Sequence, residues 1–157
     1  MVKLVTGNIF DNDVDIRVNT VNCVGVMGKG LALAFKERYP QMFAEYKVDC
    51  NCGLVRPGEM HIWKTDYVWI VNFPTKRHWR QPSCYDDIEN GLRDLRMYLK
   101  GERPVTVAMP ALGCGHGGLE WSAVKDMILL FLDDLYGVRI LLYPPKSSQV
   151  IGKGEVR

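Results

Sequence analysis

The sequence lacks the features that mark membrane and secreted proteins. No apolar run reaches the ~18 residues that a membrane-spanning helix needs. The N-terminus, MVKLVTGNIF, has neither the long apolar core nor the small-residue cleavage site of a signal peptide. The 5 cysteines are odd in number and irregularly spaced, which disfavours a secreted disulfide framework. These absences predict a cytoplasmic protein with no membrane partner.

Fingerprints of common nucleotide and metal sites are also missing. The GKG sequence at 28–30 lacks the upstream glycine and the Ser or Thr of a P-loop, which disfavours kinase or GTPase chemistry. No spaced G-x-G-x-x-G precedes a ribose-binding acid, which disfavours hydride transfer. The CNC sequence at 50–52 has no CxxC pair or partnered histidine beside it. We therefore expect no metal and no cofactor.

Length and charge are those of one ordinary globular domain. The chain has 157 residues and a net charge of +2, which leaves room for a single basic patch but does not by itself indicate nucleic-acid binding. We expect one domain over residues 1–157, with its core at 1–145 and a polar tail at 146–157.

Strand-like and helix-like segments alternate along the chain. Strands are predicted at 3–7, 15–22, 59–63, 67–73, 105–112 and 138–145. Helices are predicted at 31–39, stopped by Pro40, at 83–100, and at 121–137, ended by Gly137. Ser83 is a candidate N-cap, with Asp86 and Asp87 in the first turn. The alternation predicts an α/β fold, a three-layer sandwich whose ligands bind beyond the carboxyl ends of the strands.

Two glycine-rich loops lie where strands lead into helices, at GVMGKGLA and at GCGHGGLEW. Such loops offer backbone N–H groups to anions, and two of them favour a diphosphate, although glycines also serve ordinary turns. Asn19 and Asn22 bracket the end of one strand and either cap a turn or bind sugar hydroxyls. Asn8 could similarly contact the edge of a base.

A third strand end runs into the cationic and aromatic sequence KRHWR. Lys76 at this position is a phosphate counter-ion, a surface charge, or a nucleophile if desolvation lowers its pKa. Arg77, His78, Trp79 and Arg80 combine cations that suit phosphates with rings that suit bases. The alternative is a solvated loop with Trp79 packed inward.

Four ordered motifs, GNIF, VNTVNCVGVMGKGLALAFK, NFPTKRHWRQPS and PALGCGHGGLEW, together resemble the macrodomain family. They are most similar to the macrodomains of DarG-type antitoxins, which remove ADP-ribose from DNA bases. The resemblance covers about residues 2–145. It implies a mixed sheet between helices, with ADP-ribose in a cleft at the strand ends. It also implies functional pairing with a DNA ADP-ribosyltransferase toxin.

The resemblance implies a position for each part of ADP-ribose. Adenosine would lie against Asn8, Ile9 and Phe10, although most macrodomains have Asp at the position of Asn8. Asn22 would meet the distal ribose. The other implied contacts come from the two glycine-rich loops: Gly28, Lys29, Gly30, Leu31, Ala111, Gly113, Cys114, Gly115, His116, Gly117 and Gly118.

The resemblance also implies a catalytic residue. Lys76 matches the lysine of the DarG group and of the related terminal ADP-ribose glycohydrolases, where it acts at the anomeric carbon of the distal ribose. The terminal glycohydrolases carry Asp at the position of Gly117, so the DarG group fits better. The implied function is a DNA ADP-ribosyl glycohydrolase acting on ADP-ribosylated DNA, held by Arg77, His78, Trp79 and Arg80. The alternatives are a non-catalytic ADP-ribose-binding module and a hydrolase of ADP-ribosylated protein or small ADP-ribose derivatives.

Overall fold

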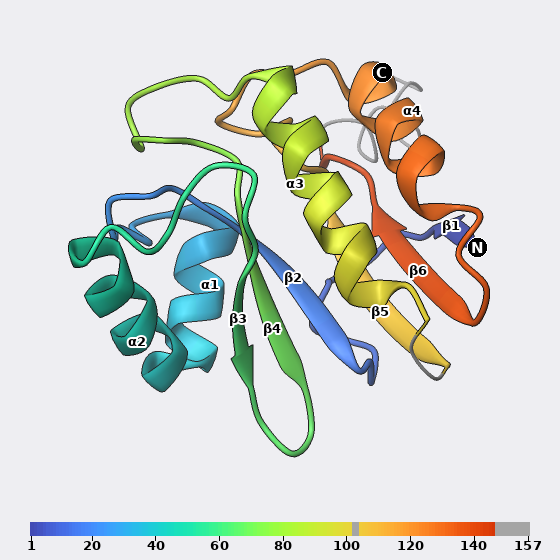
Figure 1. Cartoon of the computed structure of the whole chain (residues 1–157), viewed down its shortest axis with the longest axis horizontal. Helices are drawn as coiled ribbons and strands as arrows, with labels where there is room; N and C mark the ends of the chain where they lie inside the picture. Colours follow the sequence, from blue (N-terminus) through green and yellow to red (C-terminus); the bar gives the residue numbers. More distant parts are fainter. Residues whose placement is uncertain (102–103, 147–157) are drawn as a thin grey trace, which may run out of the picture.

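One mixed sheet organises the protein in the computed structural model, which describes residues 1–101 and 104–146 (Figure 1). Its strand order is β1-β6-β5-β2-β4-β3. The strands are β1 (Val2–Leu4), β2 (Ile16–Val21), β3 (His61–Lys64), β4 (Trp69–Pro74), β5 (Val105–Pro110) and β6 (Val138–Tyr143). Only the β3–β4 pair is antiparallel among the strands described. The carboxyl ends of the other strands therefore meet at one edge of the sheet.

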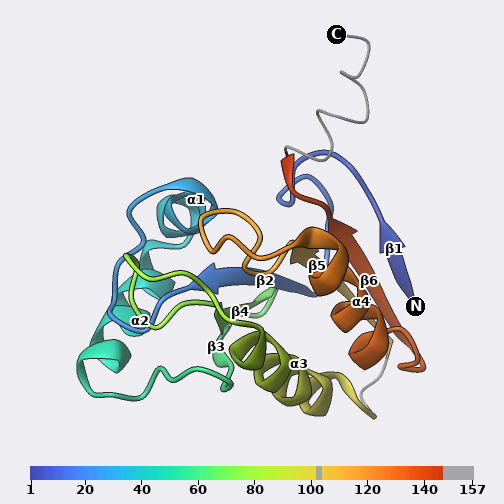
Figure 2. The ribbon, with the colours of Figure 1, turned by 90° about the horizontal axis from the view of Figure 1, so that it is seen from above.

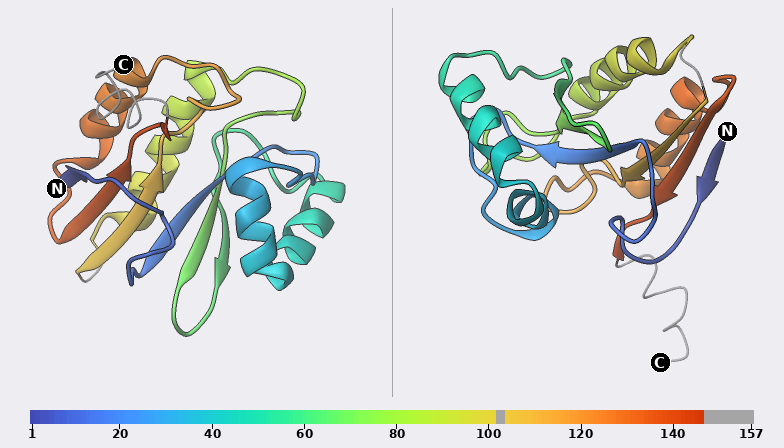
Figure 3. Two further views of the ribbon diagram at one scale, coloured as in Figure 1. Left: turned by 180° about the vertical axis from the view of Figure 1, so that it is seen from behind. Right: turned by 90° about the horizontal axis from the view of Figure 1, so that it is seen from below.

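Helices cover both faces of this sheet. They are α1 (Gly30–Arg38), α2 (Pro40–Asn51), α3 (Tyr85–Leu99) and α4 (Trp121–Leu132). Figure 2 shows α1 and α3 on opposite sides of β2, and Figure 3 shows α1 and α2 together from behind. The predicted three-layer α/β sandwich with a mixed sheet is therefore confirmed.

The alternation of side chains along β2 explains the two layers. Ile16 and Val18 pack into the large core beneath α3 and α4, whereas Val21 packs with Phe35 of α1. The α3 residues in the large core recur at helical spacing and are fully buried: Ile88, Leu92, Leu95 and Leu99. This periodicity is why α3 could be predicted from the sequence.

Several predicted boundaries are wrong. Pro40 does end α1, but it also occupies the first turn of α2, where its missing N–H costs no hydrogen bond, and α2 was not predicted. Cys84, not Ser83, is the N-cap of α3. Helix α4 ends at Leu132, and Gly137 instead adopts a φ of 76° in the turn before β6.

Two further observations concern the predicted tail and membrane-spanning helices. From residue 147 onward, the polar tail predicted at 146–157 lies outside the described residues. Within the described part of the chain, no helix is long and apolar enough to cross a membrane.

Candidate functional site

Three loops meet at the carboxyl edge of the sheet. They are the first glycine loop (24–30), the second glycine loop (111–118), and the lysine segment (75–83) that joins β4 to α3. A Cβ built on Gly30 would lie 3.8 Å from Nε2 of His116, so the two glycine loops face each other. In the lysine segment, the Lys76 N–H donates to the Val21 carbonyl (3.3 Å) and the Ser83 N–H donates to the Gly117 carbonyl (3.0 Å). The three loops thus converge, as the chain order predicted.

Lys76 is half-buried where the lysine segment leaves β4. Its Nζ donates to the Trp79 carbonyl oxygen at 3.3 Å. Burial and the nearby ammonium of Lys29 hold the pKa of Lys76 below its usual range, because both disfavour the charged form. A larger share of the Lys76 amine is therefore neutral at a given pH, which suits a nucleophile.

The Asn22 side chain shapes the first glycine loop. Its Oδ1 accepts from the N–H groups of Val24 (3.0 Å) and Val26 (3.3 Å), and its Nδ2 donates to the Val26 carbonyl (2.8 Å). The buried Tyr46 hydroxyl donates to the same Oδ1 at 3.0 Å. Asn22 therefore caps this turn, as one of the two interpretations predicted, and its partner Tyr46 on α2 was not predicted.

Asn19 does neither of the things predicted for it. It lies within β2 with no exposed surface, and its Nδ2 donates to Oδ1 of Asn72 on β4 at 3.1 Å. The Asn72 Nδ2 donates to Nδ1 of His61 on β3 at 3.1 Å, and the His61 Nε2 contacts the Asp49 carboxylate at 2.8 Å. Asn19 thus begins a buried polar ladder across three strands and cannot cap a turn or reach a sugar.

The predicted adenosine residues lie together before β2. The Asn8 Oδ1 accepts from the Phe10 N–H at 2.9 Å, which closes a tight turn. Ile9 is buried, and Phe10 packs against Phe35 with ring centres 4.8 Å apart. The Arg38 guanidinium lies 4.3 Å from the centre of the Phe10 ring. A half-exposed aromatic ring therefore stands at this end of the site.

Arg17 holds this turn in place and was not predicted from the sequence. It is buried in β2 and donates to the carbonyls of Ile9 (3.3 Å), Phe10 (3.3 Å) and Asn12 (2.6 Å). A buried cation costs free energy unless it is hydrogen-bonded, and here backbone oxygens supply the partners. The available signal was a charged residue inside a strand whose other residues, apart from Asn19, are all β-branched.

The second glycine loop is tightly packed against itself and against the lysine segment. Gly113 has a φ of 71°, a left-handed conformation that favours glycine. A Cβ on Gly117 would lie 2.5 Å from the Gly113 carbonyl oxygen and would overlap the buried Ser83 hydroxyl. The position that carries an acid in the terminal glycohydrolases therefore has no room for a side chain here.

Cys114 and the remaining loop residues differ in exposure. Burial raises the pKa of the Cys114 thiol to about 11, so it is protonated and unreactive at neutral pH. Ala111 and Leu31 are half-buried. The exposed predicted contacts are Gly28, Lys29, Gly30, Gly115, His116 and Gly118.

The cations and rings after Lys76 separate into two groups. The His78 and Trp79 rings stack with centres 5.3 Å apart, and the Arg80 guanidinium lies 4.5 Å from the Trp79 ring centre. Trp79 is 43% exposed, so the alternative of inward packing is wrong. Arg77 instead donates through Nε and Nη2 to both carboxylate oxygens of Asp87, each at 3.1 Å.

Comparison with known proteins decides the family, because the Macro domain model matches residues 18–128. The chain belongs to the Macro domain family. The solved macrodomain of Mycobacterium tuberculosis DarG is 43% identical, with a TM-score of 0.86 over 92% of this chain and 98% of that chain. A solved Thermosipho africanus DarTG in complex with ADP-ribose is 34% identical, with a TM-score of 0.85 over 92% of this chain and 42% of that chain.

Curated relatives of this macrodomain are longer proteins. The DNA ADP-ribosyl glycohydrolase of Mycobacterium tuberculosis is 43% identical over 152 residues, which are 94% of this chain and 43% of the relative. A DNA ADP-ribosyl transferase-DNA ADP-ribosyl glycohydrolase fusion protein of Thermosipho africanus is 32% identical over 95% of this chain and 43% of its own length. The chain thus spans less than half the length of these relatives.

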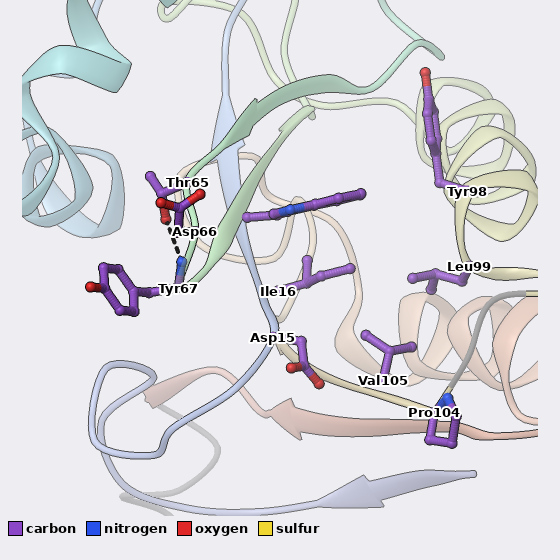
Figure 4. A pocket seen from close by; sticks show the side chains of 10 residues that line it. Asp15, Ile16, Thr65, Asp66, Tyr67, Tyr98, Leu99, Pro104 and Val105 are labelled. Carbon is purple, nitrogen blue, oxygen red and sulfur yellow. Dashed lines mark hydrogen bonds between the residues drawn. The ribbon is translucent and has the colours of Figure 1, made fainter.

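A cavity of the macrodomain lies at the opposite edge of the sheet from the three loops (Figure 4). This cavity of about 170 Å³ lies at the amino ends of β2, β4 and β5. Its lining includes the carboxylates of Asp15 and Asp66 and the rings of Tyr67 and Tyr98, and none of the predicted site residues.

Across the described residues, no group of three or more His, Cys, Asp and Glu side chains could hold a metal ion.

Proposed function

We propose that this macrodomain is a DNA ADP-ribosyl glycohydrolase that removes ADP-ribose from a modified DNA base. The observation that carries the proposal is the half-buried Lys76 amine, whose pKa is lowered by burial and by Lys29 of the first glycine loop, at the edge where the three loops meet. The names of the relatives that match nearly the whole chain support the same activity. The exposed Trp79 and Arg80 beside Lys76 favour a nucleic-acid substrate over a small one.

ADP-ribose would lie along the carboxyl edge of the sheet. Adenosine would contact the turn at 8–10, and the diphosphate would lie between the glycine loops, near Lys29. Helices α1 and α4 both begin at these loops, and neither has a side-chain cap among the described residues. Their free backbone N–H groups suit an anion. The distal ribose would then lie near Lys76.

The proposed chemistry uses the neutral form of Lys76. Its Nζ forms a bond to the anomeric carbon, while the bond from that carbon to the base breaks and leaves its electron pair on the base. The base takes up a proton, which restores the unmodified nucleotide. The ribose ring opens so that the amine and the aldehyde carbon share a Schiff base, which water hydrolyses to free ADP-ribose and Lys76.

The setting of this activity is also a proposal. We expect a DNA ADP-ribosyltransferase toxin as functional partner, since such a transferase is fused to the related glycohydrolase in Thermosipho africanus. We expect the protein to act in the cytoplasm, where the modified DNA would be. We further propose that residues 1–157 act as one domain with its core at 1–145.

The test is a time course on an oligonucleotide that carries ADP-ribose on one base. Wild type should release ADP-ribose and restore the DNA, whereas Lys76→Ala should lose at least 100-fold in rate and still bind ADP-ribose by calorimetry. Lys76→Arg keeps the charge but cannot supply a neutral amine, so it should also be inactive. Lys3→Ala, on the exposed part of β1, is the matched control.

Two results would contradict the proposal. Full activity of Lys76→Arg would make Lys76 a counter-ion instead of a nucleophile. No release by wild type, with ADP-ribose still bound, would indicate a non-catalytic ADP-ribose-binding protein or a different linkage.

A further inference from the structure

A bidentate ion pair joins Arg77 of the lysine segment to Asp87 of α3. The two guanidinium nitrogens reach the two carboxylate oxygens at 3.1 Å each, a geometry that fixes both side chains. The Asp87 side chain is only 7% exposed, while that of Arg77 is 65% exposed. The hydrogen bond from Arg77 holds the pKa of Asp87 below its usual range, so the carboxylate stays charged at neutral pH.

Asp87 is a firm anchor because of where it lies. It is in the first turn of α3, and the next residue, Ile88, is fully buried in the large core. The ion pair therefore ties the exposed lysine segment to an element that is held in place by the core.

The backbone of Arg77 is tied to the segment that follows β2. Its carbonyl accepts from the Cys23 N–H at 3.3 Å, and the Lys76 carbonyl accepts from the Cys23 thiol at 3.6 Å. Burial raises the pKa of this thiol to about 11, so the donor hydrogen is retained. The Lys76 N–H is bonded in turn to the Val21 carbonyl at the end of β2. Lys76 and Arg77 are thus held by the end of β2 and by Cys23 just after it, and from α3 through the Arg77 side chain.

We propose that Arg77 is a positioning residue for Lys76 and not a contact to DNA. Its pairing with Asp87 fixes the direction in which the chain leaves β4, and so where the Lys76 amine meets the distal ribose. This inference rests on the proposed function. It separates Arg77 from Arg80, although the two arginines lie three residues apart in one cationic sequence.

The inference predicts a distinct kinetic effect. Arg77→Lys keeps the charge but loses the two-point geometry, and Asp87→Asn loses the charge of the anchor. Both should lower kcat on ADP-ribosylated DNA about 10- to 100-fold, because a small misplacement of a reacting group is costly. KM, the affinity for ADP-ribose and the salt dependence of DNA binding should not change. The double variant should be no slower than the slower single variant, because the two residues act as one unit.

A second readout does not depend on DNA. Free ADP-ribose carries its own anomeric carbon, whose open aldehyde form can condense with the Lys76 amine with loss of water. Borohydride then reduces the Schiff base to a stable amine, which peptide mass spectrometry assigns to a residue. Arg77→Lys and Asp87→Asn should slow this trapping as much as they slow turnover. The matched control is Arg93→Lys, which alters the exposed α3 ion pair with Glu89 and should have no effect.

The outcomes separate the two proposals. Trapping at Lys76 in wild type without turnover on DNA would refute the DNA activity, while the ratio of trapping rates would still test the role of Arg77. A raised KM and a shallower salt dependence for Arg77→Lys at unchanged kcat would overturn the inference and make Arg77 a phosphate contact. Unchanged kcat and trapping in Asp87→Asn, with ADP-ribose still bound, would also overturn it.

Discussion

Lys76 and Lys29 show how the chemistry of one side chain depends on a neighbouring charge. The Lys29 ammonium helps to keep the pKa of Lys76 low. Replacing it, as in Lys29→Gln, should raise that pKa towards its ordinary value. In the proposed chemistry the amine acts unprotonated, so kcat should rise with pH through this pKa, and the variant's profile should move to higher pH. Measuring kcat at saturating substrate from pH 6 to 10 checks this, and an unmoved profile would remove Lys29 from the account.

The sequence located these residues but not their environment. It placed Lys76 at a strand end, because the strand pattern before it is clear. It could not reveal the lowered pKa, because Lys29 comes from a loop distant in the chain. For the same reason it assigned Arg77 and Arg80 one role, although only a partner on the following helix, Asp87, distinguishes them.

At the scale of elements, the contact between α3 and β4 supports the site. Gly91 of α3 packs directly on the Phe73 ring near the end of β4, and a Cβ on Gly91 would overlap that ring. Gly91→Ala should lower the free energy of unfolding by about 1–2 kcal/mol, because overpacking outweighs the ~1 kcal/mol gain in helix propensity. Urea denaturation measures this, with the exposed Met97→Ala on the same helix as control. A stability equal to wild type would mean that Phe73 moves aside without cost.

The elements also differ in how well they could be predicted. Helix α3 has four fully buried apolar residues at helical spacing, whereas the buried residues of α2 are only Met42 and Tyr46. A short helix with so narrow a buried face has little periodic signal, and Pro40 was interpreted only as a stop. The failure to predict α2 matters for the site, because α2 supplies Tyr46, and the Tyr46 hydroxyl holds the Asn22 side chain.

At the scale of the whole molecule, the candidate site and the cavity of Figure 4 carry different charged side chains. Lys29, Lys76 and Arg80 lie at the carboxyl edge, and Asp15 and Asp66 lie at the opposite edge, beside the cavity of Figure 4. The cavity edge is mixed in charge, because the Lys64 ammonium lies 4.2 Å from the ring centre of Trp69 in the cavity wall, whereas the three side chains named at the carboxyl edge are all cations. The field of the molecule should therefore orient DNA towards the carboxyl edge.

Salt titration of DNA binding tests this orientation. Arg80→Gln should reduce the slope of log affinity against log salt by about 1, as expected for the loss of one phosphate contact. Asp66→Asn, at the far edge, should leave the slope unchanged. An equal effect of both variants would indicate that net charge, and not a defined face, attracts the DNA.

The crowding at Gly117 has a consequence for how macrodomain sequences can change. A single substitution cannot introduce an acid there, because the first carbon of any side chain would meet the Gly113 carbonyl oxygen at 2.5 Å. Removing the Ser83 hydroxyl would clear only one of the two obstacles. A lineage that acquires an acid at this position must first change the course of the loop backbone. The intermediate sequences would have a lower free energy of unfolding. A sequence with an acid at position 117 is therefore separated from this one by a change in the loop backbone, and not by one substitution alone.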